Sequence, residues 1–289
     1  MKDKVKTYIQ LLRMKHYLKN CLIFIPAFFG EEIFQINIIL KLLFGFIAFS
    51  FGTSFIYIIN DIRDCEQDQK HEEKRNRPIA AGFISKKRAG FIGVGLLVMS
   101  VVMLFGVHEY AGLMYMLFYM IVNIAYSLGL KKIPIADVII LSSGFVIRII
   151  YGASIGNIVC SSWLILTIMA VSLYLALGKR RNEKNMISDG KTRDVLKKYS
   201  VDFLDAMMHM CVAIGVIFYS LWSVDIGGST QSNFFIWTIP IVIVIIMKYE
   251  MDIDAYSYGD PIEVLYKDKF LFVIGCFYAL LMFIGKYVM

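Results

Sequence analysis

The apolar run IILKLLFGFIAFSFGTSFIYII (residues 38–59) leads directly into the acidic stretch NDIRDCEQD (residues 60–68). A run of this length is sufficient for one membrane-spanning helix, which needs about 20 predominantly apolar residues. One asparagine and three aspartates follow where the chain would leave the bilayer. The junction therefore predicts a membrane helix that carries an oxygen-rich polar site at its end.

The whole chain has the composition of a membrane protein. Of its 289 residues, 58% are hydrophobic and 18% are charged, whereas soluble domains are roughly 45–50% apolar and about 25% charged. No linker separates a soluble part, so residues 1–289 are expected to form a single integral-membrane domain. Nine apolar segments are candidate spans, the first of them weak because Pro26, Glu31 and Glu32 interrupt it. They are residues 17–36, 38–59, 91–107, 112–130, 135–155, 161–177, 206–224, 234–247 and 270–288.

The distribution of basic residues predicts the orientation of these spans. Nearly all of the 30 Lys and Arg residues fall in the N-terminal segment and in every second loop, while residues 106–111, 156–160 and 225–233 contain none. Basic residues accumulate on the cytoplasmic side of short loops. We therefore expect a cytoplasmic N-terminus, with the bilayer as partner. The net charge of +7 needs no nucleic acid to explain it.

The acidic stretch has the residue types of a metal site. On a continuous helix, Asn60, Asp61, Asp64 and Asp68 fall within an arc of about 100°. Stacked carboxylates repel one another unless cations neutralise them or water screens them. Oxygen ligands of this kind suit Mg²⁺, which keeps several waters and binds through few carboxylates plus substrate phosphates. The alternative is a solvated helix end whose acids pair with the basic residues that follow, which are Lys70, Lys74, Arg75 and Arg77.

Residues 60–68 resemble the first aspartate-rich motif of the UbiA-type intramembrane prenyltransferase superfamily, and the resemblance extends over essentially the whole chain. It implies an all-α polytopic bundle of about nine transmembrane helices with a cavity facing the cytoplasm. It also implies that Asp61, Asp64 and Asp68 are catalytic and that, with Asn60, they bind Mg²⁺ and through it a diphosphate.

One feature departs from the aromatic prenyltransferases of that superfamily, which carry a second D-x-x-x-D motif near the end of the sixth span. This chain has LGKRRNEK (residues 177–184) there instead. A cationic wall favours direct contact with phosphate over contact through a metal. The alternative is that Lys179, Arg180 and Arg181 only set the membrane orientation.

Two further stretches, YSLGLKKIPIAD (residues 126–137) and YSYGDPIE (residues 256–263), together with the basic run, resemble the polyprenyl-phosphate phosphoribosyltransferase branch of the superfamily. That branch implies 5-phosphoribose 1-diphosphate as donor, a polyprenyl phosphate as acceptor, Mg²⁺ as cofactor and release of diphosphate. It also implies a bacterial plasma membrane and a role in cell-wall biosynthesis. Homo-oligomer formation is left open.

The candidate substrate-binding residues share a polar side chain near one of these stretches or inside a span. They are Lys19, Asn60, His71, Lys74, Arg75, Arg77, Tyr126, Lys131, Arg148, Lys179, Arg180, Arg181, Glu183 and Tyr258. Arg148 lies inside the fifth predicted span, where a cation is costly unless it is paired or faces water. It is therefore a functional candidate, and the alternative is an ion pair with a buried carboxylate such as Asp137.

Two other functions remain open at this stage. A prenyltransferase of the same fold would move a polyprenyl group from its diphosphate to an aromatic or other small acceptor, and the missing second acidic motif disfavours it. A transporter or channel could also carry an intramembrane arginine and acidic helix ends. We find no internal half-repeat in the sequence that would favour a transporter.

Overall fold

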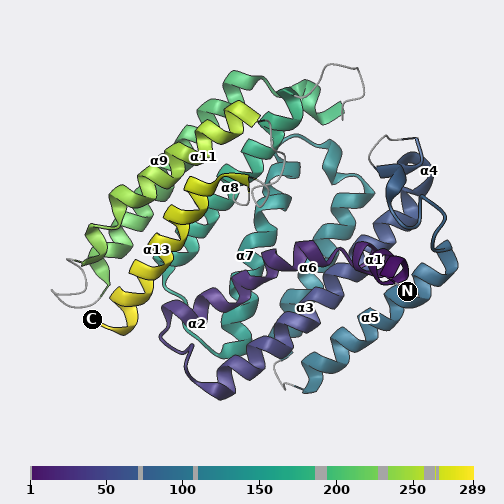
Figure 1. The fold of residues 1–289 in the computed structure, drawn as a ribbon, viewed down its shortest axis with the longest axis horizontal. Coiled ribbons are helices and arrows are strands. Elements are labelled where there is room, and N and C mark those ends of the chain that lie inside the picture. The colour runs from purple at the N-terminus through teal and green to yellow at the C-terminus, as the bar shows by residue number, and fades with distance from the viewer. Residues whose placement is uncertain are drawn as a thin grey trace. The chain divides into compact units, whose positions relative to one another are not determined.

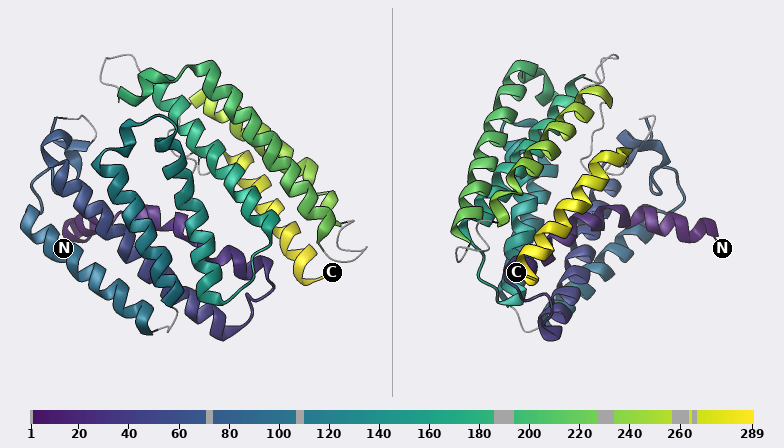
Figure 2. Two further views of the ribbon diagram at one scale, coloured as in Figure 1. Left: turned by 180° about the vertical axis from the view of Figure 1, so that it is seen from behind. Right: turned by 60° about the vertical axis from the view of Figure 1, so that its left-hand side comes forward.

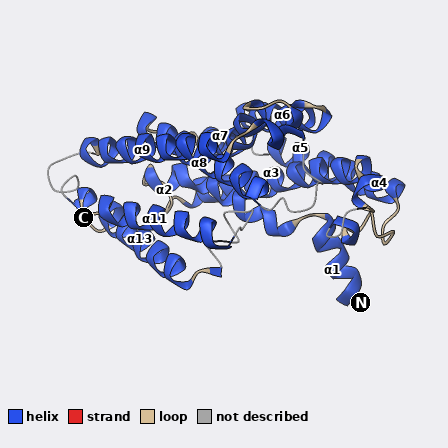
Figure 3. Ribbon diagram, turned by 90° about the horizontal axis from the view of Figure 1, so that it is seen from above, coloured by secondary structure: helices blue, strands red, loops and turns tan. Residues whose placement is uncertain are grey.

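The computed structural model describes residues 2–70, 74–106, 110–185, 194–226, 234–256, 264 and 267–289. In this described part the chain forms helices joined by loops, without a strand (Figure 3). Eight of its helices are long and apolar enough to cross a membrane. The prediction of an all-α polytopic membrane protein is confirmed.

The eight spans correspond to the second to ninth predicted segments. They are Ile36–Arg63, Lys86–Gly106, Tyr110–Leu128, Ala136–Gly156, Ser162–Asn185, Val201–Asp225, Phe234–Ile253 and Lys269–Tyr287.

The first predicted span, residues 17–36, is not a continuous α-helix. Its first part belongs to the 3₁₀ helix η1 (Met14–Phe24), and a single turn of α-helix, α2 (Ile25–Phe29), follows with Pro26 in its first turn. Glu31 then adopts a left-handed backbone conformation, with φ of 62°. The expected count of nine spans is therefore eight in the described residues, because this segment breaks at the proline and the acidic pair that had made it weak.

By internal contacts the chain divides into two compact units, and α7 (Ala136–Gly156) contributes to both. Unit 1 comprises Met1–Leu128 and Ile147–Val159, and unit 2 comprises Gly129–Val146 and Cys160–Met289. Besides η1, α2 and part of α7, unit 1 holds α1 (Lys2–Leu11), α3 (Ile36–Arg63), α4 (Cys65–Asp68), η2 (Lys74–Asn76), α5 (Lys86–Gly106) and α6 (Tyr110–Leu128).

Helix α3 is the centre of unit 1. It lies beside α5 in all views (Figures 1 and 2) and also contacts α6 and η1. On its buried face the ring of Phe49 lies 4.9 Å from that of Tyr119 and 4.8 Å from that of Tyr151. Gly152 allows α7 to approach η1 closely, since a Cβ at this position would lie 2.1 Å from the carbonyl oxygen of Ile23.

Unit 2 is built on the long pair α8 (Ser162–Asn185) and α9 (Val201–Asp225), with α11 (Ile239–Tyr256), α13 (Lys269–Tyr287) and the short helices η3 (Leu130–Lys132) and η4 (Asp194–Lys198). Local sequence fixes where two of these helices begin. The side chain of Ser200 accepts a hydrogen bond from the backbone N–H of Phe203, and that of Asp268 accepts one from Leu271. Both are ordinary N-caps, which satisfy backbone donors at the helix start.

Candidate active site

The acidic motif lies at the end of α3, but the helix does not continue through it. Helix α3 ends at Arg63, Asp64 has ψ of 5°, and a new turn, α4, contains Asp68. The single continuous helix expected from the sequence is therefore wrong at Asp64. The turn is held by backbone hydrogen bonds from the Asp64 N–H to the Asn60 carbonyl and from the Asp68 N–H to the Asp64 carbonyl, each 2.9 Å long.

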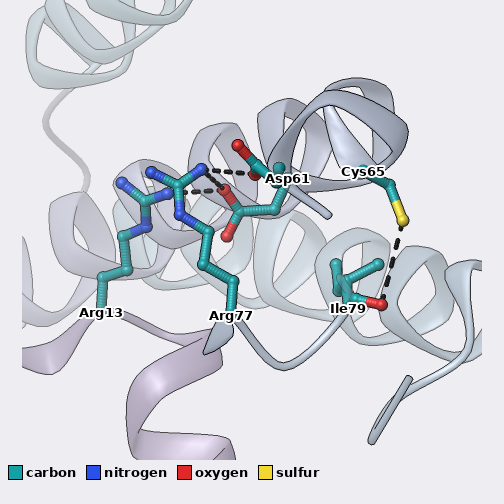
Figure 4. A network of polar contacts seen from close by, with 6 residues as sticks. Arg13, Asp61, Cys65, Arg77 and Ile79 are labelled. Atoms are coloured by element: carbon teal, nitrogen blue, oxygen red, sulfur yellow. Dashed lines mark hydrogen bonds and ion pairs between the residues drawn. The ribbon is translucent and has the colours of Figure 1, made fainter. Parts of the chain in front are cut away.

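Asp61 and Asp68 converge on one guanidinium group. Nη1 of Arg77 lies 3.0 Å from Oδ1 of Asp61 and 2.7 Å from Oδ2 of Asp68. Nη2 of Arg13 lies 2.5 Å from the same Oδ1 of Asp61 (Figure 4). Both aspartates are buried, with Asp61 only 3% exposed. Two buried carboxylates and two guanidinium groups thus form one charge-balanced cluster, which we call the Asp61 cluster.

Arg13 is a member of this cluster that the sequence did not identify. It lies far from the motif along the chain, and its backbone adopts the left-handed region with φ of 50° between α1 and η1. Its guanidinium carbon also lies 4.6 Å from the centre of the Tyr57 ring on α3. Apart from Lys19, the basic residues of the N-terminal segment were interpreted only as an orientation signal, so no pattern singled out Arg13.

The segment after α4 positions Arg77. The side chain of Gln69 donates to the carbonyl of Ala80, and the Cys65 thiol lies 3.9 Å from the carbonyl oxygen of Ile79 (Figure 4). The other candidates in and after the acidic motif differ in exposure. Asn60, Asp64 and Lys74 are half-buried, and Arg75 is exposed. His71 and Tyr258 lie outside the described residues.

The residues present fit a divalent cation held jointly with a substrate. Among the described residues no group of three or more His, Cys, Asp or Glu side chains is arranged to hold a metal ion. Asp61 and Asp68 nevertheless provide two converging carboxylates, and oxygen donors are those that Mg²⁺ prefers. Since Mg²⁺ commonly binds through one or two carboxylates and completes its shell with water and phosphate oxygens, two carboxylates suffice for a metal carried in with a diphosphate.

A second buried polar centre of unit 1 surrounds Arg148 on α7. Its Nε donates to Oδ1 of Asn20 at 2.8 Å, and its Nη2 lies 3.3 Å from the Tyr119 hydroxyl. Its guanidinium carbon lies 5.0 Å from the Tyr119 ring centre and 5.2 Å from that of Phe49. Asn20 in turn donates to Ser50. Two of the described partners of Arg148 are therefore the uncharged side chains of Asn20 and Tyr119.

In unit 2, Asp137 instead pairs with Arg180. Nε of Arg180 lies 2.6 Å from Oδ2 of Asp137, and its Nη1 lies 2.5 Å from Glu183. The Tyr199 hydroxyl donates to Oδ1 of Asp137 at 2.6 Å and accepts from the backbone N–H of Ile135, which has φ of 67°. Burial and the Asp137 carboxylate raise the pKa of Tyr199 to about 12, so the phenol stays protonated near neutral pH.

This network includes two of the residues that the sequence predicted to bind substrate. The Arg180 side chain is 1% exposed and engaged by two carboxylates. Glu183 belongs to the same network.

The remaining candidates for substrate binding lie in both units. Arg181 pairs with Asp205, and Lys179 and Lys131 are half-buried in unit 2. Lys19 and Tyr126 are half-buried in unit 1.

The protein is therefore an integral membrane protein with eight candidate spans in its described residues. A buried acidic motif lies at the end of its span α3. The chain belongs to the UbiA prenyltransferase family, whose model matches residues 23–254. This match confirms the resemblance inferred from residues 60–68 and identifies the chain as a transferase of that family.

Relatives along nearly the full length support the particular branch. The decaprenyl-phosphate phosphoribosyltransferase of Corynebacterium glutamicum is 32% identical, over 97% of this chain and 87% of its own. The enzyme of the same name from Mycolicibacterium smegmatis is 31% identical, over 94% and 90%. Among solved structures, a UbiA homolog from Archaeoglobus fulgidus bound to GPP and Mg²⁺ matches with a TM-score of 0.71 at 19% identity, covering 97% of this chain and 99% of that one. That similarity shows the fold alone.

Proposed function

We propose that this protein transfers a 5-phosphoribosyl group from 5-phosphoribose 1-diphosphate to a polyprenyl phosphate, with release of diphosphate. The observation that carries the proposal is the near full-length similarity to decaprenyl-phosphate phosphoribosyltransferases. The Asp61 cluster agrees with it, because a reaction that expels diphosphate needs carboxylates for a metal and cations for the phosphates.

The reaction joins an oxygen of the lipid phosphate to the anomeric carbon of ribose. The bond between that carbon and the diphosphate breaks, and the diphosphate departs with the electron pair. Asp61 and Asp68 would hold a divalent cation, which when bound stabilises the charge on the leaving group. A phosphate monoester is largely ionised near neutral pH, so the acceptor needs no strong general base.

The donor also carries a 5-phosphate, which requires cationic groups away from the metal. We assign this role to lysines rather than to Arg180, whose charge is already neutralised by Asp137 and Glu183. Lys19 and Lys74 in unit 1 are the candidates. Arg148 is proposed to act indirectly, by holding the side chains of Asn20 and Tyr119 in place through its hydrogen bonds.

The proposal includes an orientation and a domain assignment. The basic segments are assigned to the cytoplasm, as is the Asp61 cluster, in a bacterial plasma membrane. Residues 1–289 are proposed to act as one integral-membrane domain, since the family model spans residues from both compact units.

The test uses purified protein in detergent, so that no membrane gradient exists. Donor labelled in its ribose is incubated with a polyprenyl phosphate and Mg²⁺, and label is counted in the lipid extract. We expect label in the lipid with wild type and none with Asp68→Asn. Absence of lipid label with wild type, alongside transfer of a prenyl group to an aromatic acceptor, would assign the protein to prenyl transfer instead.

A further inference from the structure

The Asp61 cluster contains an arrangement that metal binding alone does not require. The Nη1 atom of Arg77 bridges two carboxylates that belong to different turns of the chain, Asp61 on α3 and Asp68 on α4. A guanidinium group that only formed an ion pair would be expected to engage one carboxylate through two nitrogens, since that fork geometry gives the stronger contact. Here one nitrogen lies where a bridging cation would neutralise both aspartates.

The other guanidinium nitrogens of Arg77 would allow this side chain to change its hydrogen-bond partners. All described side-chain contacts of Arg77 with polar groups are made by Nη1, so its Nε and Nη2 donors are not engaged within the described residues. Its side chain is 30% exposed, whereas that of Asp61 is 3% exposed. The carboxylates are thus buried, and the guanidinium is the part with access to solvent.

Charge balance sets the condition for such a change. Two arginines already neutralise two aspartates. A divalent cation added to Asp61 and Asp68 with both arginines in place would leave an excess of positive charge around buried oxygens, which like-charge repulsion opposes. Oxygens of a diphosphate would remove that excess, because they accept hydrogen bonds from guanidinium groups as carboxylates do.

We propose that Arg77, assisted by Arg13, exchanges partners during substrate binding: it holds Asp61 and Asp68 before binding and turns to the diphosphate when a divalent cation takes these two carboxylates. This inference rests on the metal and diphosphate site of the proposed function. Arg77 then has two opposed effects, since it competes with the metal alone and favours the metal together with diphosphate. Metal and diphosphate should consequently bind with positive coupling.

The opposed effects give a test that does not use turnover. Mn²⁺ affinity is measured on the full-length protein in detergent by electron paramagnetic resonance of the free ion, without donor or lipid. Loss of a competing charge-assisted contact should raise Mn²⁺ affinity about tenfold or more in Arg77→Gln. Arg13→Gln should raise it by less, because Arg77 still bridges the carboxylates. Arg88→Gln, which removes an exposed charge at the start of α5, should leave it unchanged.

A second measurement titrates inorganic diphosphate in the presence of Mg²⁺. Arg77→Gln should bind it about tenfold more weakly or worse, so that one substitution moves the two affinities in opposite directions. A merely structural role for Arg77 would lower both.

Unchanged or lowered Mn²⁺ affinity in Arg77→Gln would overturn the exchange. If that variant fails to fold, Arg13→Gln decides by the same criterion. Since neither measurement contains ribosyl donor or lipid, raised Mn²⁺ affinity in a protein that makes no ribosylated lipid would retain the exchange and reject the proposed function.

Discussion

Replacing Arg180 by methionine should destabilise the protein far more than the same change at its neighbour Arg181. Both arginines form ion pairs near the end of α8, but their surroundings differ. The side chains of Arg180 and Asp137 are 1% and 0% exposed, whereas those of Arg181 and Asp205 are 13% and 30% exposed. Arg180→Met leaves the Asp137 carboxylate buried with only the Tyr199 hydroxyl, since these are its two described side-chain partners.

The expected magnitudes follow from burial. Removing one partner of a buried ion pair costs about 3–5 kcal/mol because the other charge stays buried, whereas exposed pairs contribute about 0–1 kcal/mol. At about 2–4 °C for each kcal/mol in a protein of this size class, Arg180→Met should lower the apparent Tm by about 6 °C or more. Arg181→Met should lower it by about 4 °C at most.

The assay is thermal unfolding in detergent at one fixed scan rate, because unfolding of large proteins is often irreversible and rate-dependent. Adding Asp137→Asn to Arg180→Met removes the buried charge and should recover part of the loss, since asparagine can still accept from Tyr199. Equal Tm shifts for the two single variants, or no recovery in the double variant, would refute the assignment of Arg180 to a buried structural network.

Three further predictions concern packing, the metal site and the acceptor. Gly152→Ala should lower the apparent Tm by several degrees, because its Cβ would lie 2.1 Å from the Ile23 carbonyl oxygen, while Gly95→Ala, with nothing within 4 Å, should not. Asp68→Asn should abolish turnover, and wild-type activity in this variant at saturating Mg²⁺ would contradict the metal assignment. Polyprenyl phosphates of several lengths should be accepted and the matching polyprenols should not, as measured by lipid mass spectrometry; equal use of both would contradict the mechanism.

Most of the fold could be predicted because membrane insertion leaves a strong pattern in the sequence. Eight of the nine predicted apolar segments correspond to helices able to span a bilayer in the described residues. The exception, residues 17–36, became η1 and α2, since Pro26 lacks the N–H that a continuous helix would need and Glu31 adopts a left-handed conformation. Hydropathy measures apolar content over a window and does not register such local backbone geometry.

The site could be predicted only as far as its local motif. Asp61 and Asp68 were found because they lie close together along the chain, but Arg13 and the Asp137 to Arg180 pair depend on contacts between distant segments. A basic residue that orients the protein and one that neutralises a buried acid look alike in a sequence. Burial distinguishes them. The sequence predicted a phosphate contact for Arg180, and in the structure its buried side chain pairs with Asp137.

The most direct test of the central claim is mass spectrometry of the lipid products, with released diphosphate measured in the same reaction. The purified protein is given 5-phosphoribose 1-diphosphate and a polyprenyl phosphate, and in a parallel reaction a polyprenyl diphosphate and an aromatic acceptor. The proposed function predicts a lipid heavier by one phosphoribosyl group, with one diphosphate released per lipid, in the first reaction only. A prenylated aromatic product in the second reaction, with the polyprenyl phosphate unchanged in the first, would contradict it.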